Sequence, residues 1–207
     1  MKTSTWLTMG VLGLLASPCL ASQPAPSRDL AGLTIGAALA FPECGVHTTP
    51  SLGGYPSFTS YNDTAPDEVC WQRPFGDSHL GEPINPHLER VELNVRAPLP
   101  EGISQRVHVT VVNGLVEGIE LKTYGQAYQQ ALLDALSEKY GEPTYAPKKL
   151  VQNLMGATFE NQEATWTFSD MRVIFLGMTK VGEGLISIRS NALMAEEAQA
   201  KRGQPKL

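Results

Sequence analysis

The clearest pattern in the chain is a strict alternation of apolar and polar positions within residues 88–122. The alternating apolar residues are Val91, Leu93, Val95, Val107, Val109 and Val111. A period of two is typical of β-strands that bury one face. Asn113-Gly114 follows the second run, and this pair favours a two-residue hairpin because both residues tolerate positive φ. We therefore expect two strands and a return strand over residues 115–122, with Gly118 at a bulge or a close approach.

The period changes to that of a helix over residues 124–140. Thr123 and Gln126 have the spacing of a capping box, which predicts where the helix begins. Gly141 is placed to cap the carboxyl end, and Pro143 prevents the helix from resuming. We expect a helix of about four turns whose apolar side lies on the sheet.

A second group of strands is expected between residues 164 and 190, where alternation returns around the turn at Ser169-Asp170. Residues 148–163 are ambiguous, and their apolar positions suit a short helix that ends at Gly156. The fold class that follows is α+β: an antiparallel sheet of about five to six strands, in two meanders, backed by one long helix.

The amino-terminal end has the pattern of a secretory signal peptide over residues 1–21. Lys2 precedes an apolar run of about eleven residues, and Ala21 supplies the small residue before cleavage. The run is too short to span a membrane, which needs about 20 residues. Cys19 raises the alternative of a lipid anchor, but Pro18 occupies the place where a lipoprotein signal has a small residue.

The remaining chain is expected to be organised around one domain. Residues 22–29 read as a flexible leader, residues 30–190 as a single α+β domain, and residues 191–207 as a frayed helix, capped by Asn191, with a tail. Within residues 30–44, a short helix over residues 35–41 and a strand over residues 30–35 are equally compatible with the sequence. No internal sequence repeat is evident.

Residues 45–86 are rich in Gly, Pro, Ser, Thr, Asn and Asp and show no sustained period, so we expect a long irregular region. After loss of the signal, the two remaining cysteines, Cys44 and Cys70, predict one disulfide, because an exported protein meets an oxidising compartment. A bridge of this span would stabilise the fold by roughly 3 to 4 kcal/mol.

The same region concentrates aromatic residues, and two interpretations are open. Tyr55, Phe58, Tyr61 and Trp71 could form a binding surface, because aromatic side chains supply large contact area with few rotatable bonds. Alternatively, they pack the loop onto the sheet.

Charge and motifs exclude several classes of function. The chain has 16 Lys and Arg against 21 Asp and Glu, and its longest basic run is Lys148-Lys149, so no nucleic-acid partner is expected. No catalytic, phosphate-binding or metal-binding motif occurs, and we expect no cofactor. The enzyme alternative is a secreted hydrolase that uses residues of the Cys44–Cys70 loop, with His47, Asp63 and Asp67 as partners.

The sequence thus favours a periplasmic or secreted, non-enzymatic binding module with an envelope protein as a possible partner. Besides the aromatic loop, the sheet face opposite the helix is a candidate surface, since antiparallel sheets commonly leave one face in water. The residues expected on that face are Arg90, Glu92, Asn94, Arg96, Arg106, His108 and Thr110. A third hypothesis is a small-ligand carrier with an apolar pocket between sheet and helix.

Overall fold

The computed structural model describes residues 27–51, 53, 57–61, 69–74, 79–84, 87–95, 99–152, 155–180 and 182–203. The predicted signal peptide, most of the predicted leader and Tyr55 lie outside the described residues.

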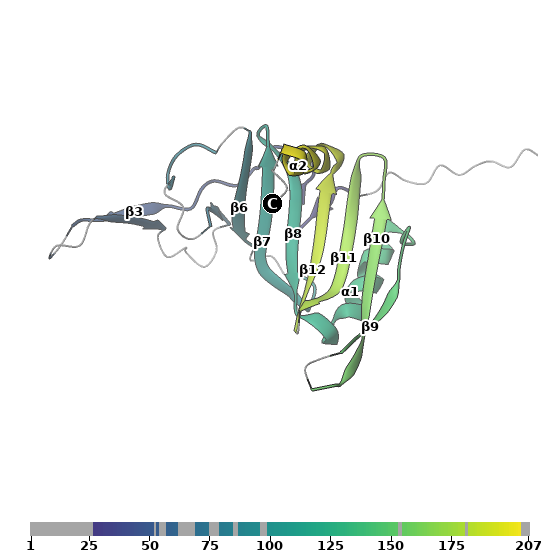
Figure 1. Cartoon of the computed structure of the whole chain (residues 1–207). Coiled ribbons are helices and arrows are strands. Elements are labelled where there is room, and N and C mark those ends of the chain that lie inside the picture. Colours follow the sequence, from purple (N-terminus) through teal and green to yellow (C-terminus); the bar gives the residue numbers. More distant parts are fainter. Residues whose placement is uncertain are drawn as a thin grey trace, which may run out of the picture.

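The centre of the molecule is an eight-stranded antiparallel sheet (Figure 1). Its strands are β5 (Trp71–Gln72), β6 (Leu88–Asn94), β7 (Ile103–Val112), β8 (Leu115–Thr123), β9 (Lys148–Gln152), β10 (Thr158–Thr167), β11 (Met171–Lys180) and β12 (Glu183–Ser190). The order in the sheet is β5-β6-β7-β8-β12-β11-β10-β9. Two sequential meanders, β5 to β8 and β9 to β12, are therefore joined where β8 pairs with β12.

The predicted antiparallel sheet of two meanders is confirmed, but the expected count of five to six strands is too low. The short helix expected around Leu150 is wrong, because residues 148–152 form β9 and pair with β10. Lys149 binds Glu163 of β10 with a Nζ–Oε2 distance of 2.7 Å, and Gly156 adopts a φ of 83° in the turn. Pairing with a strand later in the chain thus overrides the local helical spacing.

The predicted hairpin at Asn113-Gly114 is confirmed. Asn113 and Gly114 have φ values of 52° and 80°, as a turn with two left-handed residues requires. The β7–β8 register shifts after Thr110, opposite Gly118. Gly118 also meets a close neighbour, since an added Cβ would lie 2.7 Å from Cδ2 of Leu193. Both expectations for Gly118, a bulge and a close approach, are therefore met.

The long helix begins later than the capping box predicted. A 3-10 turn, η1 (Gly125–Ala127), precedes α1 (Gln129–Tyr140). Thr123 is buried in β8 and caps no helix, and Gly125 adopts a φ of 64°, which interrupts a continuous helix. The carboxyl end is as predicted, because the Gly141 N–H donates to the Ser137 carbonyl at 2.9 Å.

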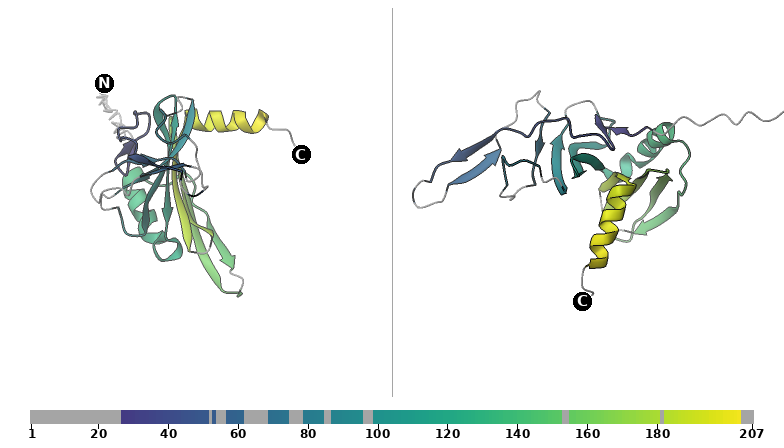
Figure 2. Two further views of the ribbon diagram at one scale, coloured as in Figure 1. Left: turned by 90° about the vertical axis from the view of Figure 1, so that its left-hand side faces the viewer. Right: turned by 90° about the horizontal axis from the view of Figure 1, so that it is seen from above.

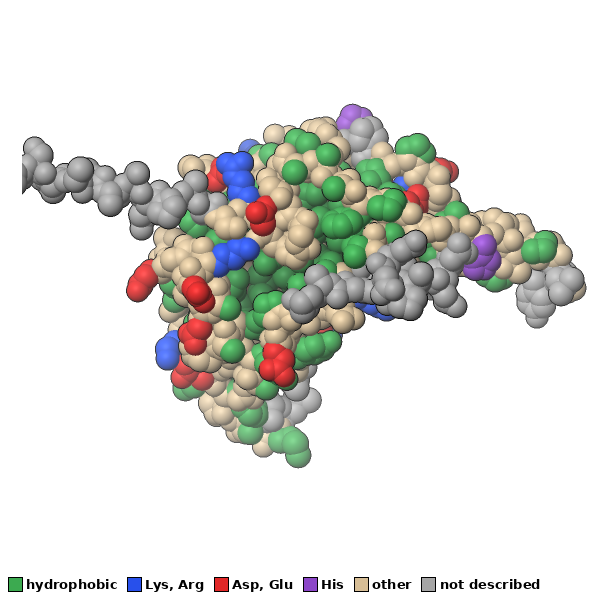
Figure 3. Space-filling model, turned by 180° about the vertical axis from the view of Figure 1, so that it is seen from behind, with side chains coloured by type: hydrophobic (Ala, Val, Ile, Leu, Met, Phe, Trp, Pro, Cys, Tyr) green, Lys and Arg blue, Asp and Glu red, His purple; other side chains and the backbone are tan. Residues whose placement is uncertain are grey.

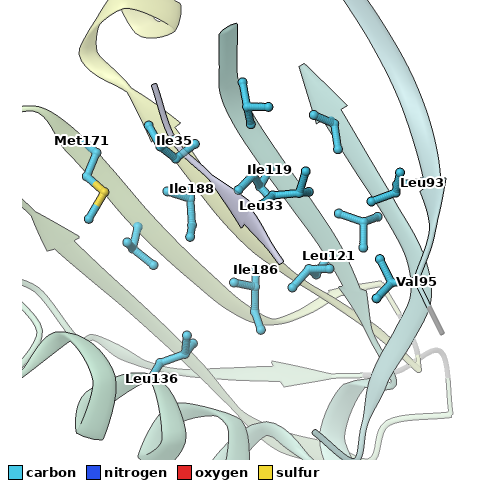
Figure 4. Packing of buried hydrophobic residues seen from close by; sticks show 14 of the residues in the cluster. Leu33, Ile35, Leu93, Val95, Ile119, Leu121, Leu136, Met171, Ile186 and Ile188 are labelled. Atoms are coloured by element: carbon cyan, nitrogen blue, oxygen red, sulfur yellow. The ribbon is translucent and has the colours of Figure 1, made fainter. Parts of the chain in front are cut away.

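The core lies between one face of the sheet and two elements that cover this face. One element is α1, which contributes Leu132 and Leu136. The other is a tight amino-terminal hairpin of β1 (Asp29–Leu30) and β2 (Leu33–Thr34). Figure 4 shows Leu33 and Ile35 of this segment over the buried side chains of β8 and β12. Residues 35–41 are not helical, and the strand expected over residues 30–35 is split by a turn at Ala31 and Gly32, both with positive φ.

The opposite face of the sheet carries α2 (Asn191–Gly203), which projects outward from one corner (Figure 2). The Leu193 N–H donates to the Ser190 hydroxyl at 3.0 Å, so Ser190, rather than the expected Asn191, supplies the side-chain cap. Leu193 is buried against Gly118, and most of the helix beyond it is exposed. This apolar contact lies at the start of α2, and the remaining length of the helix extends away from the sheet (Figure 2).

Candidate functional site

A two-stranded hairpin projects from the end of the sheet nearest β5 and β6 (Figures 1 and 2). It consists of β3 (Val46–Thr49) and β4 (Phe58–Tyr61), which pair only with each other among the described strands, and we call it the arm. The arm and β5 lie within residues 45–86, where an irregular region is expected. Residues 46–49, 58–61 and 71–72 form strands, and the other described residues of this region belong to no strand or helix. The β-branched and aromatic residues of the arm explain why strands form here.

A disulfide closes the base of the arm. Cys44 and Cys70 are bonded, with 5.0 Å between their Cα atoms, which confirms the predicted bridge. Backbone hydrogen bonds reinforce it, since the Cys44 N–H donates to the Trp71 carbonyl at 2.9 Å and the Trp71 N–H donates to the Pro42 carbonyl at 3.0 Å. The chain entering the arm therefore lies beside β5, the first strand of the large sheet.

A buried cation fixes the base further. The Arg73 side chain is 2% exposed, and it contacts Glu43 through Nη1 and Glu89 through Nε, each at 2.7 Å. Its Nη2 donates to the Glu82 carbonyl at 2.8 Å, and its guanidinium lies 5.1 Å from the centre of the Trp71 ring. Arg73 thus connects three parts of the chain: the segment that precedes the disulfide, through Glu43; β5, through Trp71; and β6, through Glu89.

Electrostatics keep this guanidinium charged. Burial disfavours the charged form, but the carboxylates of Glu89 and Glu43 outweigh burial, so the pKa of Arg73 is raised. A buried charge is tolerated only when it is paired and hydrogen-bonded in this way. The arrangement is therefore a structural anchor with a defined geometry.

Tyr61 connects the anchor to the arm. Its hydroxyl donates to Glu43 Oε1 at 2.9 Å and accepts from the Arg73 backbone N–H at 2.9 Å. Burial, together with the neighbouring Glu43 carboxylate, raises the pKa of Tyr61. The last residue of β4 is thus held by the Glu43 carboxylate and by the backbone of Arg73, which sets the direction in which the arm leaves the sheet.

The aromatic residues predicted as one binding surface do not lie together. Trp71 is 5% exposed and belongs to the core, and Tyr61 is half-buried at the base. Phe58 is 58% exposed on the arm. Trp71 and Tyr61 therefore match the packing interpretation, and Phe58 is the member of this set that remains available to a partner among the described residues.

The remaining described surface of the arm is polar and carries no Lys, Arg, Asp or Glu. The hydroxyls of Thr48 and Thr59 lie 3.0 Å apart across the strands, and Ser60 Oγ lies 3.3 Å from His47 Nε2. A two-stranded hairpin has little stability of its own in water. The arm therefore depends on its base for a defined position.

Sequence reasoning missed Glu43, Arg73 and Glu89. One signal was present, since Glu43 precedes the first cysteine and Arg73 lies three residues after the second. Oppositely charged residues beside two bonded cysteines are brought together by the bond. Glu89 has no such signal, because its position depends on how β5 pairs with β6.

The sheet face opposite α1 is polar, as expected, but its charges pair with one another. Arg189 contacts Glu120 at 2.6 Å and Glu197 of α2 at 3.1 Å. His108 Nδ1 lies 3.6 Å from Glu92. Arg90 and Arg106 are exposed and Thr110 is half-buried, whereas the Asn94 side chain and Arg96 lie outside the described residues. Many of the charged groups that this face could offer to a partner are therefore engaged in ion pairs, some of them with α2.

An apolar groove lies at the end of the sheet where η1, the β9–β10 hairpin and the end of β11 meet. Its volume is about 550 Å³, and Tyr124, Val151, Phe159 and Met178 line it. In Figure 3, hydrophobic side chains gather at the lowest point of the molecule, the β9–β10 hairpin, where Leu150 and Met155 are 77% and 93% exposed. This groove is far along the sheet from the arm.

The residues of the hydrolase hypothesis are only partly described. Cys44 is disulfide-bonded and so has no thiolate for attack, His47 is exposed on the arm, and Asp63 and Asp67 lie outside the described residues. Within the described ranges, no three His, Cys, Asp or Glu side chains converge as metal ligands. In the same ranges, no helix combines the length and apolar character needed to cross a bilayer.

Comparison with known proteins yields no relative: no family model, no curated protein and no solved structure matches this chain.

Proposed function

We propose that the protein is an exported, non-enzymatic binding module and that the arm contacts a protein partner in the cell envelope. The observation that carries this proposal is the contrast between the arm and its base. The arm is an exposed hairpin outside the core, whereas its base is held by a disulfide, a buried ion-paired arginine and a buried tryptophan.

Such a base favours binding rather than stability alone. A buried ion pair contributes little net stability, because desolvation offsets the attraction between the charges. It does define geometry, and a contact element held in one orientation loses less conformational freedom when it binds. Arg73 and Tyr61 support the proposal because they fix the arm at its exit from the sheet.

The surface of the arm suits an uncharged, extended segment of a partner. Each arm strand has one neighbouring strand in its two-stranded sheet, and such edges accept a further strand through main-chain hydrogen bonds. Phe58 would add an apolar anchor, and the threonine hydroxyls would add polar contacts at the rim. The absence of charge on the described arm argues against recognition of a strongly acidic or basic partner.

Export is part of the proposal. The disulfide is compatible with an oxidising compartment, and the predicted signal peptide would deliver the chain there. Titration of free thiols in protein purified from the periplasm checks this directly. Two free thiols would contradict the oxidised state and restore the hydrolase alternative.

Site-specific photo-crosslinking tests the arm. A benzophenone amino acid at the exposed Ser57 should give discrete adducts in the periplasm of the expressing cell, and the same label at Tyr145, which is 63% exposed and distant in the fold, should not. Phe58→Ser should remove the adducts without lowering the melting temperature. Equal adducts from both labels, or none from Ser57, would overturn the proposal.

A further inference from the structure

The groove between η1 and the β9–β10 hairpin is lined mainly by apolar side chains. Residues from five different segments line it, including Ala127 of η1, Val151 of β9, Phe159 of β10 and Met178 of β11. Its volume of about 550 Å³ lies within the range of small-molecule sites.

Several contacts hold the elements around the groove in fixed positions. Gly125 packs backbone against backbone on the β11–β12 turn, where a Cβ on Gly125 would lie 2.7 Å from the carbonyl carbon of Gly182. Gln129 Nε2 donates to the Glu160 carbonyl at 2.7 Å, and Asn161 bonds both the N–H and the carbonyl of Met178. These contacts fix η1 on the β11–β12 turn, the start of α1 on β10, and β10 on β11, so the groove exists before any ligand arrives.

The groove carries a positive charge at Lys180. Among the described residues that line it, Lys180 is the one with a charged side chain, and none has a carboxylate. The Lys180 Nζ lies 3.0 Å from Glu183 Oε2, but both side chains are well exposed, at 67% and 42%. Such a surface pair is weak and can be displaced by a better placed anion.

We propose that this groove binds a small amphiphile with one anionic head group and an alkyl chain, such as a fatty acid. The alkyl chain would lie against Phe159, Val151 and Met178, and the carboxylate would pair with Lys180. Met178 suits a flexible chain because its unbranched thioether adapts to irregular apolar shapes. The charge pattern excludes a cationic amphiphile, and this site is independent of the arm.

Isothermal titration calorimetry of the oxidised protein with alkyl carboxylates tests the proposal. Affinity should rise about fourfold with each methylene from octanoate to dodecanoate, and dodecyltrimethylammonium should bind at least tenfold more weakly than dodecanoate. No heat with any carboxylate, or equal affinity for the cation, would overturn it.

Variants separate the groove from adventitious surface binding. Ala127→Leu and, independently, Gln126→Trp place bulk into the groove from exposed positions of η1 and should abolish binding. Ala135→Leu, at an exposed position of α1 outside the groove, is the matched control and should bind as the natural protein does. Lys180→Gln should weaken dodecanoate binding fivefold or more, whereas Glu183→Gln should strengthen it by freeing Lys180. Dodecanoate binding that is unchanged in both groove-filling variants, or unchanged in Lys180→Gln, contradicts the proposal.

Discussion

Arg73, the residue that follows β5, forms an ion pair with Glu89 of β6, with 2.7 Å between Nε and Oε1, and the arginine side chain is 2% exposed. The pair lies beside the disulfide and above the buried Trp71 ring, so one contact joins β6 to the base of the arm. Removing the cation would leave two carboxylates without their shared partner.

Arg73→Met is therefore expected to lower the free energy of unfolding by about 3 to 5 kcal/mol, measured by urea denaturation of the oxidised protein. The matched control is Arg28→Met, because Arg28 also pairs with a carboxylate, that of Asp170, but is 54% exposed. The control should change stability by less than about 1 kcal/mol. Equal effects of the two substitutions would show that Arg73 is not an anchor.

Removing the disulfide should increase local opening of the arm more than local opening of the large sheet. The bridge spans 26 residues, so Cys44→Ala combined with Cys70→Ala is expected to lower the free energy of unfolding by roughly 3 kcal/mol. Hydrogen exchange should show lost protection in β3 and β4, which lie outside the core, while β7 and β8 remain protected. A reductant should reproduce the effect in the natural protein and have no effect on the variant. Unchanged exchange in the arm would contradict its dependence on the bridge.

Because Tyr140 is buried, the protein is expected to lose stability in alkaline solution. Burial, with a smaller contribution from the charge of Asp29, raises the pKa of Tyr140 well above that of the unfolded chain, which is about 10. The folded protein therefore keeps a proton that the unfolded chain releases, so stability is fully present below pH 10 and falls as pH rises above it. The slope is about 1.4 kcal/mol per pH unit for this one group.

Tyr140→Phe should remove this contribution. The Tyr140 hydroxyl has no hydrogen-bond partner among the described residues, so the variant should match the natural protein to within about 1 kcal/mol at pH 7. Urea midpoints at pH 8, 10 and 11 should diverge only at the higher values, with the variant the more stable. Tyr124→Phe, at a tyrosine that is 58% exposed, is the control and should follow the natural protein throughout. Parallel curves for Tyr140→Phe would refute the prediction.

Gly118 is expected to determine the position of α2. A valine there would place its Cβ 2.7 Å from Leu193 Cδ2 and 3.1 Å from Thr110 Cβ, so Gly118→Val should cost about 1 to 3 kcal/mol and expose α2 to hydrogen exchange. Leu193→Ala creates room for the valine. The double variant should therefore be more stable than the sum of the two single effects, and strict additivity would show that the helix does not depend on this contact.

The elements that the sequence predicts well are those whose burial pattern is local. The alternation at Val107 and Val109, the turn at Asn113-Gly114 and the cap at Gly141 each depend on neighbours within one or two elements. β9 does not, because Leu150 is 77% exposed and the strand exists through pairing with β10. Its apolar spacing therefore carries no information about burial.

In the candidate site, too, some features follow from the sequence and others depend on tertiary pairing. The disulfide follows from cysteine count and compartment, which are properties of the sequence. The burial of Arg73 requires that the chain on both sides of the bridge meet β6, which depends on tertiary pairing. Trp71 was ambiguous for a related reason, since an aromatic residue in a glycine-rich region has the same local sequence whether it faces solvent or the core.

The closed base also determines how the protein would respond to mechanical load. A partner that pulled on the arm would draw on a loop closed by a covalent bond between Cys44 and Cys70, 26 residues apart in the chain. Fully extended, a loop of that size reaches at most about 45 Å from its base, half the contour of the open segment. Tension beyond that length would pass through the sulfur atoms into β5 and the sheet instead of drawing out further chain, so the arm would act as a tether of fixed maximum length.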